Sequence, residues 1–338
     1  MKAVVLVGGE GTRLRPLTAT VPKPLLPLVD RPILDHVLDH LVAHGVREVI
    51  MSSPYLEDTF HSFIEARGGE PAITWITEPE PLGTGGAIVS ALDHLGDEPF
   101  FAVNGDILTD LDLTAMLESH RERGAVATIA LHHVEDARAF GLVVTGPTGR
   151  VTEFREKPPD PISGDINAGT YVLESSALLA WPAETYIWIE GEIFPTLIRD
   201  GAAVYGFDAA AAYWLDLGTP QQYLRAHVDL LAGRVRDISY EAPWVGPGAS
   251  VDPAAHVGRW VVIGEGGRVG SGAVVDEAVL LAGAVVDEGA RVVRSIVGPG
   301  GTVGRGATLV DSVLGEGAEV PPGATLEAVR LGSGEQAP

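Results

Sequence analysis

Glycines and basic side chains gather near the N-terminus in a spacing that suits phosphate groups. They are Gly8, Gly9, Gly11, Thr12, Arg13 and Lys23. Glycine lets the backbone approach a ligand without a Cβ clash and lets successive N–H groups turn toward an anion. A guanidinium adds bidentate contacts to phosphate, and an ammonium adds a point charge. The segment therefore predicts a binding loop for a nucleotide.

Two well-known phosphate loops do not fit this segment. A Walker A loop requires Gly-Lys followed by Ser or Thr, but Thr12-Arg13 follows Gly11 here. The dinucleotide pattern G-x-G-x-x-G starts at Gly9 and fails at Leu14. The loop therefore belongs to neither class.

Two aspartates lie where a sheet would present them to a ligand. Asp106 follows the apolar run 100–103, and Asp216 lies in the segment YWLDLGTP over residues 213–220. Ligands of open α/β sheets bind at the carboxyl ends of strands, so the Asp106 carboxylate should project into that crevice. An isolated aspartate after a strand would by itself suggest a turn or a cap.

The elements that must position these residues alternate along the first part of the chain. Residues 1–232 predict a mainly parallel, doubly wound α/β sheet with helices on its faces. The expected strands cover residues 3–7, 48–51, 73–77, 100–103, 128–131 and 142–145. A helix is expected over 33–44, with an apolar face and Gly45 as its stop signal.

Three histidines of that helix raise the question of a metal site. His36, His40 and His44 follow one another at a spacing of four residues. No HExxH pattern is present, and the three alternate with Asp35 and Asp39. We therefore expect a solvated polar face rather than a metal site.

After a predicted linker over residues 233–243, apolar residues recur with a period of six. The series runs Val245, Val251, Val257, Ile263, Val269, Val275 and Leu281, with one-residue slips before Val286, Val297 and Leu314. Such a hexapeptide repeat predicts a β-solenoid in which aliphatic side chains stack inside the coils. The register holds too long for a disordered glycine-rich tail. The solenoid should span residues 244–332, with a tail over 333–338.

The motif G-x-G-T-R-L-R-P-L-T followed by P-K-P resembles the signature of the sugar-1-phosphate nucleotidyltransferases. The resemblance extends down most of the chain, and the solenoid looks like the left-handed parallel β-helix that accompanies many members. It implies a Rossmann-like catalytic domain over 1–232. It also implies transfer of a nucleotidyl group from a nucleoside triphosphate to a sugar 1-phosphate, with release of pyrophosphate.

The resemblance also assigns roles to individual residues. Arg13 and Lys23 would be catalytic, contacting the β- and γ-phosphates and the α-phosphate or leaving group. Asp106 and Asp216 would hold Mg²⁺, which hard carboxylate oxygens favour. The nucleotide would contact Gly8, Gly9, Gly11, Thr12, Glu78, Gly83 and Thr84. The sugar phosphate would contact Gly141, Glu156, Lys157 and Asn167.

Residues 78–87 bear on the choice of base. They resemble the E-x-P-L-G-T-A-G stretch of mannose-1-phosphate guanylyltransferases, with Gly85 in place of Ala. Guanine presents two donors, N1–H and N2–H₂, which an acceptor-only carboxylate at Glu78 or Glu80 would complement, and we expect Glu78 to read guanine.

Mannose as the sugar rests on the resemblance alone. Residues 189–195 are similar to the guanylyltransferases' S-I-E-K-E-hydrophobe-F-P segment, but Trp188 stands in place of Ser and Gly191 in place of Lys. Glucose 1-phosphate with dTTP, UTP or ATP is the alternative.

Two other function classes are weighed against this interpretation. Acyltransferases of the β-helix type generally use a solenoid histidine, and this solenoid offers only His256 and no long inserted loop. A catalytically silent, nucleotide-sugar-sensing subunit would be expected to lose its cations or carboxylates, which this chain retains. We expect the solenoid to serve assembly or regulation, within a homo-oligomer.

Composition limits the partners and the compartment. The 338 residues carry a net charge of −23, which disfavours nucleic acid and anionic membranes as partners. Hydrophobic residues make up 46% of the chain, enough for a sizeable core. The absence of cysteine fits a reducing compartment, and no leader or membrane-spanning stretch is recognised, so we expect a cytoplasmic protein.

Overall fold

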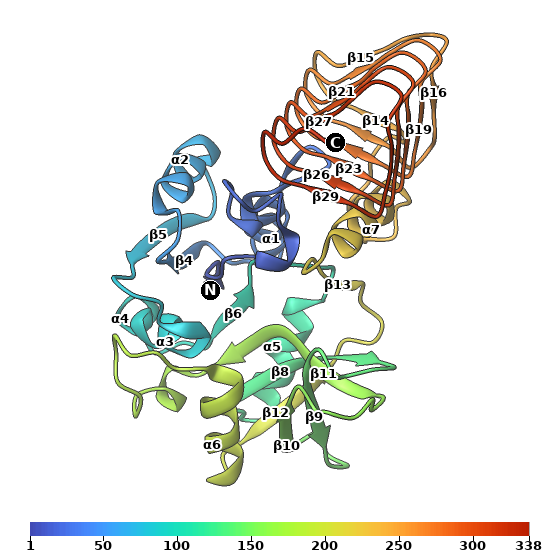
Figure 1. Cartoon of the computed structure of the whole chain (residues 1–338). Helices are drawn as coiled ribbons and strands as arrows, with labels where there is room; N and C mark the ends of the chain where they lie inside the picture. Colours follow the sequence, from blue (N-terminus) through green and yellow to red (C-terminus); the bar gives the residue numbers. More distant parts are fainter. Residues whose placement is uncertain (338) are drawn as a thin grey trace. The chain divides into compact units, whose positions relative to one another are not determined.

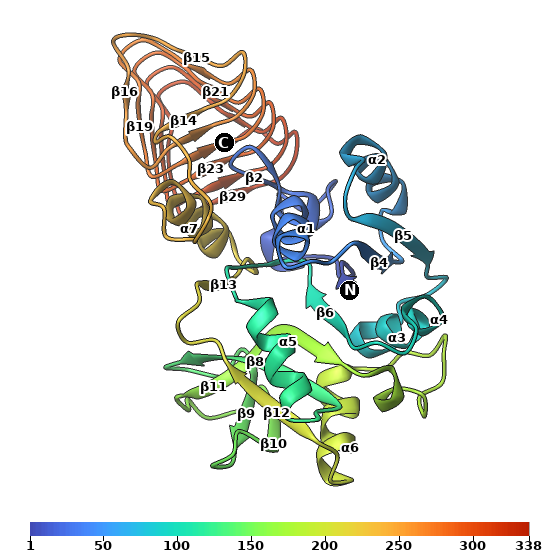
Figure 2. The same ribbon diagram turned by 180° about the vertical axis from the view of Figure 1, so that it is seen from behind.

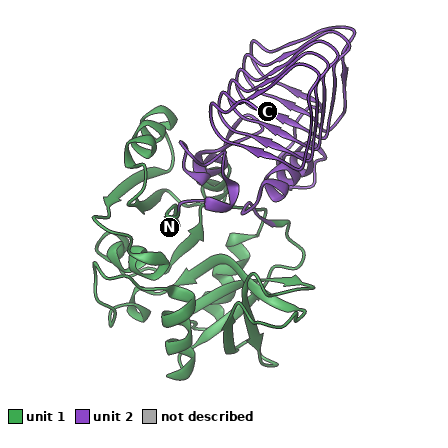
Figure 3. Cartoon of the chain, viewed as in Figure 1, with its two compact units in different colours: residues 1–9, 36–214 green, residues 10–35, 215–338 purple. Residues whose placement is uncertain are grey.

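The computed structural model (Figure 1) describes residues 1–337, which form two compact units (Figure 3). Unit 1 contains residues 1–9 and 36–214, and unit 2 combines residues 10–35 with the chain from residue 215 onward. These units do not coincide with a boundary at residue 232. The glycine-rich segment begins in unit 1 and continues in unit 2, so each unit is described by itself.

Unit 1 is built on a nine-stranded sheet with the order β10-β9-β11-β6-β1-β4-β5, in which β8 pairs with β11 and β12. Its strands are β1 Lys2–Leu6, β4 Glu48–Ser53, β5 Ala72–Thr77, β6 Phe100–Asn104, β8 Ala127–Val134, β9 Gly141–Thr145, β10 Val151–Glu156, β11 Gly164–Leu173 and β12 Val204–Asp208. Each strand predicted from the apolar runs is present.

The sheet combines parallel and antiparallel pairs, and β12 also runs parallel to β8. Strands β5, β4, β1 and β6 run parallel to one another, as predicted. Beyond β6 the pairings of β11 with β6, β8 and β9 are antiparallel. The sheet is therefore mixed, and its parallel half places the carboxyl ends of β1 and β6 side by side. Buried aliphatic and aromatic side chains such as Val4, Phe100 and Tyr171 fill its core.

Helices and helical turns complete the fold. They are α1 Ile33–Ala43, α2 Glu57–Arg67, α3 Gly83–Ser90, α4 Leu92–Leu95, α5 Leu113–Glu122, α6 Phe194–Arg199, α7 Pro220–Leu231, the 3-10 turns η1 Thr12–Leu14, η2 Lys23–Leu25 and η3 Ser175–Ala177, and the π-helical turn η4 Ile189–Ile193. Helix α5 contacts β8, β11 and β12 and is seen against them in Figure 2. No helix within residues 1–337 combines the length and apolarity needed to cross a membrane.

Helix α1 corrects one prediction. His36 is only 4% exposed, and burial, followed by the charge of His44, lowers the pKa of His40 to about 4. The face predicted to be solvated is therefore largely covered. Groups of three or more His, Cys, Asp or Glu residues that could bind a metal are absent from residues 1–337.

Unit 2 contains a parallel β-helix made of three sheets (Figure 1). Its strands are β14 Trp244–Val245, β15 Ser250–Val251, β16 His256–Val257, β17 Val262–Ile263, β18 Arg268–Val269, β19 Val274–Asp276, β20 Val279–Leu280, β21 Val285–Val286, β22 Arg291–Val293, β23 Ile296–Val297, β24 Thr302–Val303, β25 Thr308–Val310, β26 Val313–Leu314, β27 Glu319–Val320, β28 Thr325–Glu327 and β29 Arg330–Leu331. The remaining short strands of the chain are β2 Pro27–Leu28, β3 Arg31–Pro32, β7 Ile107–Thr109 and β13 Trp214–Asp216. The six-residue period thus correctly predicted the solenoid.

The slips in the period have a structural cause. Strands β14, β17 and β20 begin at residues 244, 262 and 279, so the first coil spans 18 residues and the next 17. The shorter coils turn one corner through a residue with positive φ. These corner residues are Glu277, Arg294, Asp311 and Ala328.

The first slip lies one residue earlier than predicted. Leu280 pairs with Ile263 and packs inside the coil, so the predicted interior position of Leu281 is wrong. Val245, in the first coil, is 45% exposed rather than interior.

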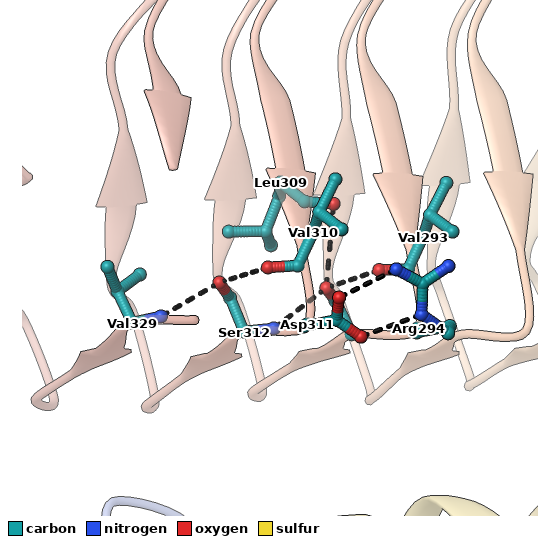
Figure 4. Close-up of polar contacts among 8 residues, drawn as sticks. Val293, Arg294, Leu309, Val310, Asp311, Ser312 and Val329 are labelled. Carbon is teal, nitrogen blue, oxygen red and sulfur yellow. Dashed lines mark hydrogen bonds and ion pairs between the residues drawn. The ribbon is translucent and has the colours of Figure 1, made fainter. Parts of the chain in front are cut away.

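Polar contacts connect successive corners of the solenoid (Figure 4). The guanidinium of Arg294 forms two hydrogen bonds with the Asp311 carboxylate, at 2.7 and 2.6 Å. The buried hydroxyl of Ser312 donates to the Val310 carbonyl and accepts from the N–H of Val329. The two Ser312 bonds satisfy a backbone carbonyl and a backbone N–H at the corners, where the strand ladders stop.

Candidate active site

In unit 1, the predicted phosphate loop leaves β1 beside the turn that carries Asp106. Leu6 and Asn104 are register partners in the parallel pair β1–β6, and the Gly105 N–H donates to the Leu6 carbonyl at 2.9 Å. A Cβ added to Gly8 or Gly9 would meet nothing within 4 Å. The missing side chains therefore leave open space beside the backbone at this strand end.

Oxygen donors lie at the same strand end. Asp106 is partly buried in the turn after β6. Two residues earlier, the buried Oδ1 of Asn104 accepts no hydrogen bond from residues 1–337. An amide oxygen without a hydrogen-bond partner and a carboxylate two residues later are both hard donors, the kind of ligand that Mg²⁺ takes.

In unit 2, the structure brings Arg13, Lys23 and Asp216 together. Lys23 Nζ lies 3.3 Å from Asp216 Oδ1, and their side chains are 8% and 19% exposed. A Cβ on Gly218 would lie 2.9 Å from Asp216 Oδ2 and 3.2 Å from Arg13 Nη2. Asp216 therefore lies between the two cations' contacts, with Lys23 at one of its oxygens and Arg13 beside the same Gly218, where a side chain would collide with the carboxylate.

Local geometry explains how the loop presents these cations. Gly11 has a φ of +58°, and its carbonyl accepts a hydrogen bond from the Thr18 hydroxyl at 2.8 Å. A Cβ on Gly11 would come within 3.2 Å of Lys23 Cβ. Thr12 then begins η1, and Lys23 begins η2 between two prolines. Gly11 therefore serves close packing around Lys23.

The last coils of the β-helix hold the same loop. Arg330 Nη1 donates to the carbonyls of Arg13 and Arg15, at 3.0 and 3.5 Å. The Thr20 hydroxyl donates to Glu316 Oε2 at 3.1 Å. The backbone that carries Arg13 is thus fixed from the solenoid.

Glu78 is buried and already engaged within unit 1. The Ser52 hydroxyl donates to its Oε1 at 2.5 Å, and the Leu82 N–H donates to its Oε2 at 3.1 Å. Each carboxylate oxygen keeps a further lone pair, so the carboxylate can still accept from a base.

Gly83 and Thr84 meet a segment about 100 residues away in the sequence. Gly83 has a φ of +69°, and a Cβ there would lie 2.7 Å from the Ile187 carbonyl oxygen. The Thr84 hydroxyl donates to Glu190 Oε2 at 2.9 Å and accepts from the Ile189 N–H at 3.1 Å. These two predicted nucleotide residues therefore connect α3 to η4.

The predicted sugar-phosphate residues lie on neighbouring strands of unit 1. Gly141 on β9 pairs with Glu156 on β10, and a Cβ on Gly141 would lie 2.9 Å from Glu156 Oε2. Lys157 Nζ lies 3.0 Å from Glu156 Oε1, and the Lys157 side chain is 60% exposed. Asn167, on β11, donates from Nδ2 to the Tyr171 hydroxyl at 2.7 Å.

Two residues that were not predicted as site residues join this group. The Tyr171 hydroxyl donates to Glu190 Oε1 at 3.4 Å. Burial raises the pKa of the Glu190 carboxyl and, together with the Glu190 charge, that of the Tyr171 phenol. Glu190 lies inside the segment 189–195 that resembles a family motif, so the sequence could have indicated it as a site residue. Tyr171 lies in no such motif, and nothing in the sequence signals it beyond its place in a strand.

Comparisons with known proteins identify the family of the chain. Residues 2–233 match the nucleotidyl transferase family model, and residues 240–331 match the model described as the GMPPB C-terminal domain. A mannose-1-phosphate guanylyltransferase of Mycobacterium tuberculosis is 39% identical over 295 residues, covering 84% of this chain and 81% of the relative. A mannose-1-phosphate guanylyltransferase catalytic subunit beta of Danio rerio is 39% identical over 268 residues, covering 77% and 73%.

Two solved structures are similar to about two thirds of the chain. HddC from Yersinia pseudotuberculosis superposes with a TM-score of 0.59 at 29% identity, covering 67% of this chain and 97% of that one. A second HddC structure, complexed with GMP-PN, has a TM-score of 0.58.

The chain therefore belongs to the nucleotidyl transferase family and is a nucleotidyltransferase enzyme. Within that family it is similar to the mannose-1-phosphate guanylyltransferases, which confirms the resemblance inferred from its sequence.

Proposed function

We propose that the chain transfers GMP from GTP to mannose 1-phosphate, forming GDP-mannose and releasing pyrophosphate. The observation that carries this proposal is the 39% identity to a mannose-1-phosphate guanylyltransferase across 84% of the chain. The placement of Lys23 against Asp216, and of Asp216 and Arg13 beside Gly218, supports it, because two reacting anions need fixed cations nearby.

In the proposed reaction the side chains must neutralise phosphate charge, and no general base is required. One oxygen of the sugar phosphate attacks the α-phosphorus in line with the leaving pyrophosphate, and that oxygen is already ionised. Arg13 would bind the β- and γ-phosphates through its planar guanidinium. Lys23 would place a point charge at the α-phosphate or leaving group, and Gly8, Gly9, Gly11 and Thr12 would line the phosphates.

Asp106 and Asp216 remain our proposed Mg²⁺ ligands. When bound, the metal would neutralise the charge that develops on the phosphates. Asp106→Ala should lower turnover about 10³-fold and weaken Mn²⁺ binding, which can be followed by electron paramagnetic resonance without turnover. The exposed Asp97→Ala is the matched control. Near-normal turnover and Mn²⁺ binding in Asp106→Ala would refute the assignment.

Glu78 is proposed to read guanine through its remaining lone pairs. Glu78→Gln should reduce the preference for GTP over ATP, because an amide presents a donor as well as an acceptor. The exposed Glu80→Gln is the matched control. An unchanged preference in Glu78→Gln would mean that another residue reads the base.

On the sugar side, Lys157 would bind the sugar's phosphate, Glu156 and Asn167 its hydroxyls, and Gly141 would offer a backbone N–H. The full proposal is tested by pyrophosphate release with Mg²⁺ across GTP, dTTP, UTP and ATP against mannose and glucose 1-phosphates. Selective turnover of GTP with mannose 1-phosphate is expected. Preference for glucose 1-phosphate with another triphosphate would overturn the specificity, and no turnover would favour a regulatory subunit.

We further propose a homo-oligomer that works in the cytoplasm. Sedimentation equilibrium of the full chain would test self-association, and a single monomeric species would refute it. Fractionation of the source cells would test the compartment.

A further inference from the structure

Residues 188–195 depart from the guanylyltransferase pattern at two positions, Trp188 and Gly191. These two residues are in direct contact. A Cβ added to Gly191 would lie 2.5 Å from Cε3 of the Trp188 indole and 3.0 Å from its Cδ2 and Cζ3. The backbone of Gly191 does not have a positive φ, so its conformation does not demand glycine. Gly191 is therefore needed for space, and the space is occupied by Trp188.

The backbone of Trp188 is fixed from both sides. Its N–H donates to Glu192 Oε1 at 2.9 Å, and its carbonyl accepts from the Glu192 N–H at 2.8 Å. The side chain nevertheless remains 37% exposed, although tryptophan is a costly residue to leave in water. An indole held in place with part of its surface open calls for an explanation beyond core packing.

The indole has a charged neighbour. Lys157 Nζ lies over its ring, 5.8 Å from the centroid, which is within cation–π range. The same ammonium lies 3.0 Å from Glu156 Oε1, and the Lys157 N–H donates to the Phe140 carbonyl at 3.0 Å. The Lys157 side chain is 60% exposed, yet its backbone is bonded to Phe140 and its ammonium contacts both Glu156 and the indole.

We propose that Trp188 is a positioning residue for Lys157 and that Gly191 acts only by making room for it. The indole restricts the ammonium before substrate arrives, which reduces the entropy lost when the sugar's phosphate binds. This inference rests on the proposed function, because Lys157 is there the cation that meets the sugar 1-phosphate. It predicts an effect on one substrate and none on the other.

The test is a double-mutant cycle read out as KM for each substrate. Trp188→Ala should raise KM for mannose 1-phosphate about two- to fivefold and leave KM for GTP unchanged. Gly191→Ala should do the same, because the new Cβ displaces the indole. The double variant should be no worse than Trp188→Ala, and Trp188→Phe should recover part of the loss.

Controls separate positioning from folding. The Arg259–Trp260 pair in the β-helix is also a cation–π contact, with 4.6 Å from guanidinium carbon to ring centroid, and Trp260→Ala should leave both KM values unchanged. Thermal melting of every variant checks the fold.

The outcomes also separate this inference from the proposed function. An unchanged KM in Trp188→Ala, equal shifts for both substrates, or additive effects of the two substitutions would overturn the inference. Failure of the wild-type chain to use mannose 1-phosphate would instead refute the proposed function. The same cycle would then be run on the sugar 1-phosphate that is turned over, and a chain that uses none overturns both.

Discussion

Lys23 in unit 2 and Lys157 in unit 1 carry the same charge in opposite surroundings. The Lys23 side chain is 8% exposed, lies between two prolines and faces Asp216 at 3.3 Å. The Lys157 side chain is 60% exposed and lies beside Glu156 and an indole. The first cation is part of the packed interior of its unit, whereas the second is held only at the surface.

The difference shows that one residue type can be used in two ways. A buried charge must keep its partner, so its removal disturbs both folding and chemistry. An exposed charge costs little to hold in solvent, so its removal should affect only the ligand that it meets. The four predictions that follow test this contrast.

The largest effect is expected for Lys23→Met. The change leaves Asp216 poorly solvated and without its ammonium partner, so the free energy of unfolding should fall by about 3 kcal/mol in urea denaturation. Loss of a fixed cation at the phosphates should also lower kcat/KM about 10²- to 10³-fold. Removing both charges in Lys23→Met with Asp216→Asn should restore much of the stability but none of the activity. A Lys23→Met variant that is stable and active would contradict the proposed difference between Lys23 and Lys157.

Lys157→Met should have a narrower effect. A charge-assisted hydrogen bond to phosphate contributes about 1.5–3 kcal/mol, so KM for mannose 1-phosphate should rise about 10- to 100-fold in steady-state assays. The free energy of unfolding, measured in urea, should stay within about 1 kcal/mol of the wild-type value, because the ion pair of Lys157 with Glu156 is exposed. A loss of stability as large as that of Lys23→Met would contradict the comparison.

The pH dependence of stability should report on the buried carboxyl of Glu190. Burial raises the pKa of Glu190 above its usual 4.5, so folding favours the neutral acid. Its contribution to stability is fully present below about pH 4.5 and is lost as pH rises through the raised pKa.

Replacement by glutamine should remove this dependence. The stability of Glu190→Gln relative to wild type should therefore increase from about pH 4.5 toward 7 in urea denaturation. The exposed Glu80→Gln should follow the wild-type curve. A Glu190→Gln curve parallel to wild type would mean that this carboxyl titrates as it does in solvent.

The smallest effect is expected from salt. Raising KCl screens exposed charges more than buried ones, so KM for mannose 1-phosphate should rise about twofold in an assay at constant pH. The contribution of the Lys23–Asp216 pair to stability should change less. If KCl changed the KM and the contribution of the Lys23–Asp216 pair to stability equally, water would have to reach Lys23.

The parts of the fold that follow from local periodicity were predictable. Apolar runs located the strands of unit 1, and the six-residue period located the solenoid. The period could not decide between Leu280 and Leu281, because both are leucines and the corner at Glu277 uses positive φ without a glycine. The buried histidines of α1 were mispredicted because alternation with aspartates says nothing about what packs on a helix face.

The sequence indicated the charged residues of the candidate site, and their roles stay predictions. Arg13, Lys23 and Asp216 are brought together as the motifs suggested. The glycines at the start of α3 suggested phosphate contact, yet Gly83 approaches the Ile187 carbonyl. Contacts between residues about 100 positions apart leave no local pattern, so the sequence alone could not indicate Glu190 as the partner of Thr84.

The bonds from Arg330 to the carbonyls of Arg13 and Arg15 limit how this protein can change in evolution. Repeat proteins commonly change length by gaining or losing whole repeats. Here each inserted coil would carry the final strand about 4.8 Å along the solenoid axis and away from the loop that it holds. We therefore expect the number of coils to stay constant, because adding or removing one would separate Arg330 from the loop that carries Arg13.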